Sequence, residues 1–242
     1  MTDLLQLMKE RQSSRTPFDP KAPVSRQDLQ QILEAGSWAP TAHNMQNFEA
    51  LVVDDNKILK QISEIEFPVS KSFIQENYLQ LSFSEEELQC KKTGVLATMF
   101  PKSWLKPNQI PLKIQNENTD SQTERHHQLL SCTALIMLLY DPAKRAPASE
   151  GDFLGIMSIG CVLENMWLMA ASLGIGLHVV SALSAEEPEM KIKKMLDIPD
   201  FLKIAISFRL GYPLFSPKYL RVRREIGGFA HINHYGKLGL AD

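Results

Sequence analysis

One nearly unbroken apolar run, TALIMLLYDP starting at Thr133, constrains the fold more than any other stretch. A strand with one solvated face alternates polar and apolar residues, whereas a strand covered on both faces is apolar throughout. The run ends at Asp141-Pro142, a typical turn signal. The sequence therefore predicts a central strand that is buried under helices on both sides.

Helices and further strands are predicted around this run. Apolar residues at helical spacing predict a first helix that ends near Arg11. Ser25 with Asp28 predicts the start of a second helix, and Gly36 predicts its end. The long apolar stretch 152–173 predicts a core helix.

Two more strands are predicted, at residues 48–55 and in FLKIAISFRLGYP, which Gly211 and Pro213 end. A short strand follows the glycines of LGIGLHVV. Ser184 with Glu187 predicts a capping box that opens another helix. The polar stretch from Gln115 is predicted to be a loop and not a domain boundary.

The predicted fold class is α+β, with a central, mostly antiparallel sheet wrapped by helices in a single domain over residues 1–242. A doubly wound Rossmann sheet is the rival architecture. No GxGxxG follows the first predicted strand, and no P-loop sequence is present, which disfavours the rival.

Composition and residue spacing disfavour several classes of protein and several kinds of site. The 242 residues carry a net charge of −2 without a basic block, which disfavours nucleic acid as a partner. The three cysteines form no CxxC, so neither a zinc site nor a disulfide framework is predicted. His231 and His234 have no further ligand nearby in sequence, and no metal is expected. The first residues lack a signal-peptide pattern, and the prediction is a cytoplasmic protein without a membrane span.

An alternating arginine–serine segment, RQSSRTPFDP, predicts an anion site. In an extended chain Arg11, Ser13 and Arg15 point the same way. Two guanidinium forks and a hydroxyl suit a phosphate group. A solvated helix C-terminus, where cations are favoured, remains the alternative for these residues.

A polar loop, APTAHNMQNF, follows the second predicted helix. The amides of Asn44 and Gln46 each offer a donor and an acceptor, which can contact hydroxyl groups or a uracil-like ring edge. An ordinary connection that uses Asn and Pro as turn formers is the alternative.

Together these motifs resemble the FMN-dependent nitroreductase family. The shared pattern is Arg-x-Ser-x-Arg near the N-terminus and then Ala-Pro-[Ser/Thr]-x-x-Asn-x-Gln, and the segments around the apolar helix, FRLGYP and RVRREIGGFAHINHYG also match. The resemblance covers about two-thirds of the chain, and residues 94–113 match nothing recognisable.

The resemblance implies FMN as the cofactor, with no catalytic acid or base, because the flavin itself carries the hydride. Arg223, with Arg221 as second candidate, would add a C-terminal phosphate ligand. Backbone groups of residues 180–182 would face the flavin N5 edge. The implied cofactor-binding residues are Arg11, Ser13, Arg15, Asn44, Gln46, Val180, Ser181, Ala182, Arg221 and Arg223.

Two departures from the family pattern fall near the expected substrate site. The family commonly has Pro-Trp where this chain has Asn47-Phe48, and a small residue where it has His43. His43 and Phe48 are therefore the predicted substrate-binding residues. His178, beside the expected flavin edge, is a further candidate contact.

The implied activity is an NAD(P)H oxidoreductase that passes hydride to FMN and then to a nitroaromatic or quinone-like acceptor. The alternatives are an FMN-dependent dehydrogenase or reductive dehalogenase of a specific metabolite, and a flavin-holding protein without turnover.

A homodimer with shared flavin sites is also implied. The apolar helix would face the sheet with Ile156, Ile159, Leu163 and Trp167 and a second copy with Met157, Val162, Met166 and Met169. The C-terminal arm, about residues 216–242, would wrap the partner subunit. Asn44 and Gln46 would reach the flavin held by the other subunit's Arg11.

Overall fold

A computed structural model describes residues 3–66, 72, 74–97, 129, 131–215 and 220–237. The chain divides into two compact units, which are described separately: Met1–Phe67 with Arg125–Pro217, and Pro68–Glu124 with Lys218–Asp242. The polar loop predicted from Gln115 lies outside the described residues.

The first unit contains the sheet and most of the helices. Its elements are α1 (Leu4–Glu10), α2 (Arg26–Ser37), the 3₁₀ turn η1 (Ala42–Asn44), β1 (Glu49–Val53), α3 (Asn56–Ser63), β4 (Ala134–Tyr140), α7 (Phe153–Ser172), β5 (Gly176–Val179), η7 (Ser181–Ser184), α8 (Glu186–Met195) and β6 (Lys203–Gly211). The strands lie in the order β1-β4-β6-β5, and every neighbouring pair is antiparallel. The predicted α+β class and antiparallel sheet are confirmed.

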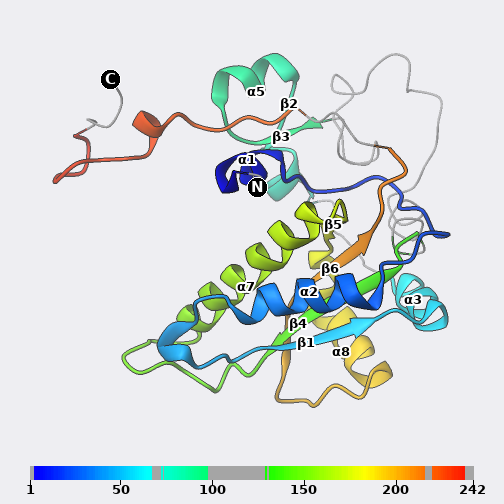
Figure 1. The fold of residues 1–242 in the computed structure, drawn as a ribbon. Coiled ribbons are helices and arrows are strands. Elements are labelled where there is room, and N and C mark those ends of the chain that lie inside the picture. The colour runs from blue at the N-terminus through cyan, green and yellow to red at the C-terminus, as the bar shows by residue number, and fades with distance from the viewer. Residues whose placement is uncertain are drawn as a thin grey trace. The chain divides into compact units, whose positions relative to one another are not determined.

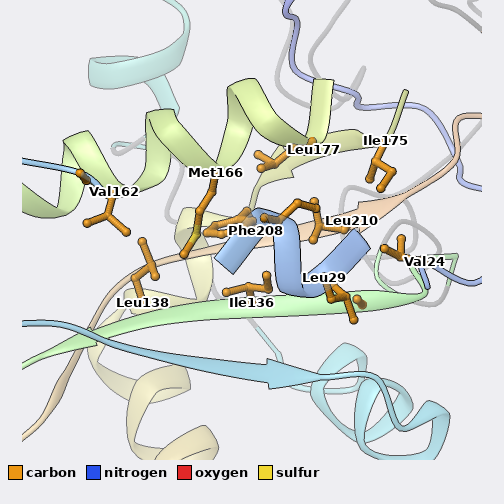
Figure 2. Close-up of a cluster of buried hydrophobic side chains, with 14 of the residues drawn as sticks. Val24, Leu29, Ile136, Leu138, Val162, Met166, Ile175, Leu177, Phe208 and Leu210 are labelled. Atoms are coloured by element: carbon orange, nitrogen blue, oxygen red, sulfur yellow. The ribbon is translucent and has the colours of Figure 1, made fainter. Parts of the chain in front are cut away.

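Strand β4 is the centre of the core, as its apolar run predicts. All seven of its residues are buried, and they alternate between two clusters. Ala134, Ile136, Leu138 and Tyr140 join α2 and α7, while Leu135, Met137 and Leu139 join α3 and α8. Figure 1 shows the two helix layers on either side of the sheet. Figure 2 shows Val162 and Met166 of α7 pointing towards Ile136 and Leu138.

Helix α2 begins as predicted, with the Ser25 side chain accepting from the Asp28 amide. The prediction that Gly36 ends it is wrong, since α2 continues to Ser37 and is capped by Trp38. A Cβ at Gly36 would clash with Met166 of α7. The glycine therefore permits the close packing of α2 on α7.

The capping box predicted at Ser184 is also wrong. Ser184 closes η7, and Ala185 takes the N-cap position of α8 without a side-chain bond. The buried Leu183 anchors η7 in the core, which moves the start of α8 one residue further on. Glu187 instead accepts a hydrogen bond from Lys191, one helical turn later.

The face that α7 turns to the sheet differs from the predicted one. Its buried residues are Ile159, Val162, Met166 and Ala170, so Val162 and Met166 pack inward, whereas Ile156 is exposed. By length and composition α7 could cross a membrane, but core helices of globular proteins also meet this criterion. Its contacts with α2 and the sheet identify it as a core helix here.

The second unit contains the π-helical turn η2 (Ile74–Tyr78), β2 (Ser82–Phe83), α5 (Glu85–Lys91), β3 (Val95–Leu96) and the 3₁₀ turn η8 (Ile226–Gly228). Strands β2 and β3 pair in parallel. A capping box between Ser84 and Glu87 starts α5. Within residues 220–237, Phe229 and Tyr235 are exposed.

Candidate functional site

The predicted anion-binding segment lies along the free edge of β5. Ser13 forms an isolated parallel bridge with Leu177, and the Ser14 amide donates to the Leu177 carbonyl at 2.8 Å. Burial alternates along the segment: Ser14, Thr16 and Phe18 are buried, while Arg11, Ser13 and Arg15 are only half-buried. Ser13 and Arg15 therefore lie on the more accessible side of the segment. Gln12 is half-buried as well, so the predicted common side for Arg11 stays a prediction.

Arg11 follows directly after α1 and lies against α7. Its Nε is 3.1 Å from Oε1 of Glu164, and its guanidinium carbon is 4.4 Å from the ring centre of Trp167. The aromatic face and the carboxylate fix the plane of the guanidinium. A guanidinium has five N–H donors, so one carboxylate does not exhaust its capacity to bind an anion.

A buried arginine, which the sequence analysis missed, holds this segment from the other side. Arg209 of β6 is fully buried. Its Nη2 donates to the carbonyls of Ser14 and Thr16 at 3.1 and 2.9 Å, and its Nε donates to Nδ1 of His178 at 3.1 Å. The guanidinium also packs over the Phe18 ring. The signal in the sequence was a lone charge within the predicted core strand AISFRLGY.

His178 is neutral in this arrangement. Burial, then the positive charges of Arg209 and Arg15, lower its pKa to about 3. Because Nδ1 accepts a hydrogen bond, the proton of the neutral ring resides on Nε2. His178 faces away from Leu177, since adjacent residues of β5 point to opposite faces of the sheet. His178 therefore accepts a hydrogen bond from Arg209 and does not face the side of the segment that carries Ser13.

The loop around η1 has a strained backbone. His43, Asn44 and Gln46 have φ angles of 53°, 52° and 47°, a region that side chains rarely adopt. The Gln46 side chain donates to Oδ1 of Asn44 at 3.1 Å, and the Gln46 amide donates to Oγ1 of Thr41. Strain of this kind concentrates at ligand sites. The structure thus brings the two predicted amides together on an exposed loop.

Within one chain, the loop and Arg11 contact α7 at different positions along its length. The amide of Ala42 donates to Oγ of Ser158, near the start of α7, whereas Arg11 contacts Glu164 and Trp167 further along. Six residues of helix, Ser158 to Glu164, span about 9 Å. The arginine segment and the amide loop therefore contact different parts of α7.

The two departures from the family pattern have different surroundings. Asn47 ties the loop to the chain after β4, because its side chain donates to the carbonyls of Asp141 and Lys144 and accepts from the Asp141 amide. Phe48 is half-buried against the core, while His43 is exposed. The assignment of His43 and Phe48 to substrate binding stays a prediction.

The turn after β5 offers backbone donors at two of its three predicted positions. The Val180 amide already donates to the Ser207 carbonyl at 2.7 Å. Ser181 and Ala182 begin η7, and the first amides of such a turn have no acceptor within it. A contact with a ligand edge is therefore expected from Ser181 and Ala182 in preference to Val180.

The C-terminal arginines belong to the second unit, and their part in the site stays a prediction. Nη1 of Arg223 donates to the carbonyl of Val222. Arg224 lies over the Phe229 ring. The ring of His231 packs on Tyr235, and the described parts of the chain contain no cluster of three or more potential metal ligands.

Comparison with known proteins identifies the relatives of this chain. Residues 8–212 match the model of the nitroreductase family. An NADPH-dependent oxidoreductase from Staphylococcus haemolyticus is 25% identical over 207 residues, which are 86% of this chain and 63% of that protein. The chain thus spans less than two-thirds of the length of this curated relative.

Solved structures share the fold. A nitroreductase with bound FMN from Bacteroides fragilis superposes with a TM-score of 0.59 at 18% identity, covering 96% of this chain and all of that one. A nitroreductase family protein from Clostridium novyi gives a TM-score of 0.56 at 18% identity, covering 98% of this chain and 97% of the other.

Proposed function

Because the chain belongs to the nitroreductase family, we propose that it is an FMN-dependent oxidoreductase. Its electron donor is NADPH or NADH, and its acceptor is a small oxidised molecule of the nitroaromatic or quinone type. The single observation that carries this proposal is the arginine–serine segment, which pairs with the edge of β5 and leaves Arg11, Ser13 and Arg15 half-buried.

The described residues fit the chemistry of FMN. A phosphate needs several charge-assisted donors to replace its hydration, and the segment supplies two guanidinium groups and a hydroxyl. The ribityl chain and the ring edge need neutral donors and acceptors, which the Asn44 and Gln46 amides supply. FMN, when bound, would supply the redox chemistry, which is the transfer of hydride from the nicotinamide to the acceptor.

The protein's own residues would bind the flavin and orient it. Arg11, braced by Glu164 and Trp167, holds the phosphate end. The first amides of η7 hold the ring edge where reduction adds a proton and electron density. His43, exposed on the strained loop, lies among the residues that select the acceptor. No side chain has to act as an acid or base for hydride to arrive.

A shared site in a homodimer completes the proposal. Helix α7 is apolar on most sides, yet Phe153, Ile156 and Met157 are exposed. Gly160 lies on this exposed side, and a Cβ added there would meet no described atom within 4 Å, so this side of α7 is open to a close neighbour. A second α7 across a two-fold axis covers it and sets the loop of one subunit beside the Arg11 region of the other.

Anaerobic reduction tests the function. Purified protein is reconstituted with FMN, mixed with NADPH or NADH without oxygen, and followed by the flavin absorbance. Rapid bleaching by at least one nucleotide, followed by reoxidation with a quinone, is the expected result. No bound FMN after reconstitution, or no bleaching with either nucleotide, would overturn the proposal.

A further inference from the structure

The most deeply buried charge of the described chain has no direct role in the site proposed above. Arg209 has no exposed surface, and an arginine stays protonated at every accessible pH. It takes the place of an apolar side chain in the middle of β6, between Phe208 and Leu210, which are equally buried. Burial of a charge is unfavourable unless its hydrogen-bond donors are satisfied, so the side chain has a specific role.

Two hydrogen-bond partners of Arg209 lie in the segment that carries the predicted ligands. Nη2 binds the carbonyls of Ser14 and Thr16, which flank Arg15 on both sides. The segment pairs with β5 through an isolated bridge, in which the Ser14 amide donates to the Leu177 carbonyl. Two of the hydrogen bonds that fix its backbone therefore come from the side chain of Arg209.

His178 fixes the orientation of the guanidinium. Its Nδ1 accepts from Nε of Arg209, opposite which it lies in the β5–β6 register. Nη1 lies 3.4 Å from Oγ of Ser131, and the Phe18 ring covers one flat face. Only a planar fork can address His178 and two carbonyls at once. A lysine ammonium is a point charge without this geometry.

We infer that Arg209 is a positioning residue, which fixes the backbone around Arg15 so that Ser13 and Arg15 meet the FMN in a preset arrangement. It does not touch the ligand, because it holds the segment from the buried side. Fixing a binding group before the ligand arrives avoids the entropy cost of ordering it on binding. This assignment rests on the proposed function and adds to it a residue of the core strand.

FMN titration of the full-length apoprotein tests the inference. Arg209→Lys is expected to raise the dissociation constant for FMN at least tenfold and to speed hydrogen exchange of the Ser14 amide. Ser207→Ala is the matched control, since Ser207 lies two residues earlier on the same strand, is equally buried and is expected to change neither value. Unchanged affinity and unchanged exchange in Arg209→Lys would overturn the inference.

General destabilisation is separated by a second control. Leu138→Ala removes a core side chain of β4 that packs with α2 and α7, away from the segment. If Leu138→Ala weakens FMN binding as much as Arg209→Lys, the effect of Arg209 is not specific and the inference falls. A much smaller loss in Leu138→Ala supports positioning.

A second pair of variants decides the matter if Arg209→Lys does not fold. His178→Gln keeps an acceptor for Nε of Arg209, whereas His178→Leu removes it. We expect His178→Gln to have a dissociation constant for FMN within twofold of wild type and His178→Leu to have one at least threefold higher. Equal values for the two variants would overturn the inference.

Failure of the proposed function remains distinguishable. If wild-type protein does not bind FMN, the proposed function falls. Hydrogen exchange of the Ser14 amide in the apoprotein still tests whether Arg209 fixes the backbone of the segment. Unaltered exchange in Arg209→Lys, or in His178→Leu, would then refute it.

Discussion

Nε of Arg11 lies 3.1 Å from Oε1 of Glu164, and the same guanidinium packs on the ring of Trp167. The pair joins the end of α1 to the second half of α7. Part of its surface is exposed, so the ion pair itself adds little to stability. The pair instead orients the Arg11 guanidinium, because it holds this group against α7 before any anion binds.

Arg11→Ala is expected to weaken FMN binding by about 1.5–3 kcal/mol, the range for a hydrogen bond to a charged group. The scaffold should stay folded, because α1 has no buried residues. Equilibrium titration at physiological salt, with circular dichroism as the check on folding, measures both.

Arg26→Ala is the matched control for this change. Arg26 also forms an ion pair, with Asp54, but is highly exposed at the start of α2. It should leave FMN affinity within twofold of wild type. Wild-type affinity in Arg11→Ala would remove Arg11 from the phosphate site.

The sheet could be predicted from the sequence because the pattern that identifies each strand lies within the strand itself. The run in β4 leaves no solvated face, so burial on both sides follows from the residues alone. The orientation of α7 could not be predicted, since a helix that is apolar all round gives no preference for one face. Val162 and Met166 pack inward, and the missing side chain of Gly36 on α2 makes room for Met166.

The same distinction holds in the site. Alternation predicts Ser13 and Arg15 on one side, and both lie on the more accessible side of the segment, whereas Ser14 and Thr16 are buried. Arg209 was missed, because its partners Ser14 and Thr16 are almost two hundred positions away in the chain. Contacts at that separation depend on topology, which short-range patterns do not encode.

His178 should make the protein sensitive to acid. Burial, Arg209 and Arg15 lower its pKa to about 3, whereas in the unfolded chain it is near 6.5. Above pH 6.5 the ring is neutral in both states. As the pH falls below 6.5 the unfolded chain binds a proton that the folded ring refuses, and unfolding becomes easier by about 1.4 kcal/mol per pH unit towards pH 3.

His178→Gln cannot take up this proton. Its free energy of unfolding, measured by denaturant titration from pH 7 to 4, should fall less steeply than that of wild type. Parallel curves for the two proteins would show that His178 is protonated equally in the folded and unfolded states.

Gly36→Ala should destabilise the packing of α2 on α7. The added Cβ collides with the buried Met166, and overpacking of about 1–3 kcal/mol exceeds the gain of about 1 kcal/mol in helix propensity. We expect a net loss of about 1 kcal/mol in urea unfolding. In a Met166→Val background, where the collision is relieved, the same change should stabilise; a loss in both backgrounds would point to another cause.

Mixed dimers test the shared site. Arg11→Ala chains lack a phosphate ligand, and Asn44→Ala chains lack a loop amide. If each flavin contacts Arg11 of one subunit and Asn44 of the other, a heterodimer of the two variants has one site with both changes and one that is intact. Co-refolded mixtures should therefore regain FMN binding at up to one site per heterodimer, which is half a site per subunit, and each variant refolded alone should not.

Light scattering at micromolar concentration provides the accompanying measurement. A monomer would end the shared-site proposal, because the exposed side of α7 would then have no symmetric cover. A dimer whose mixed form regains no binding would keep the interface but refute the shared site.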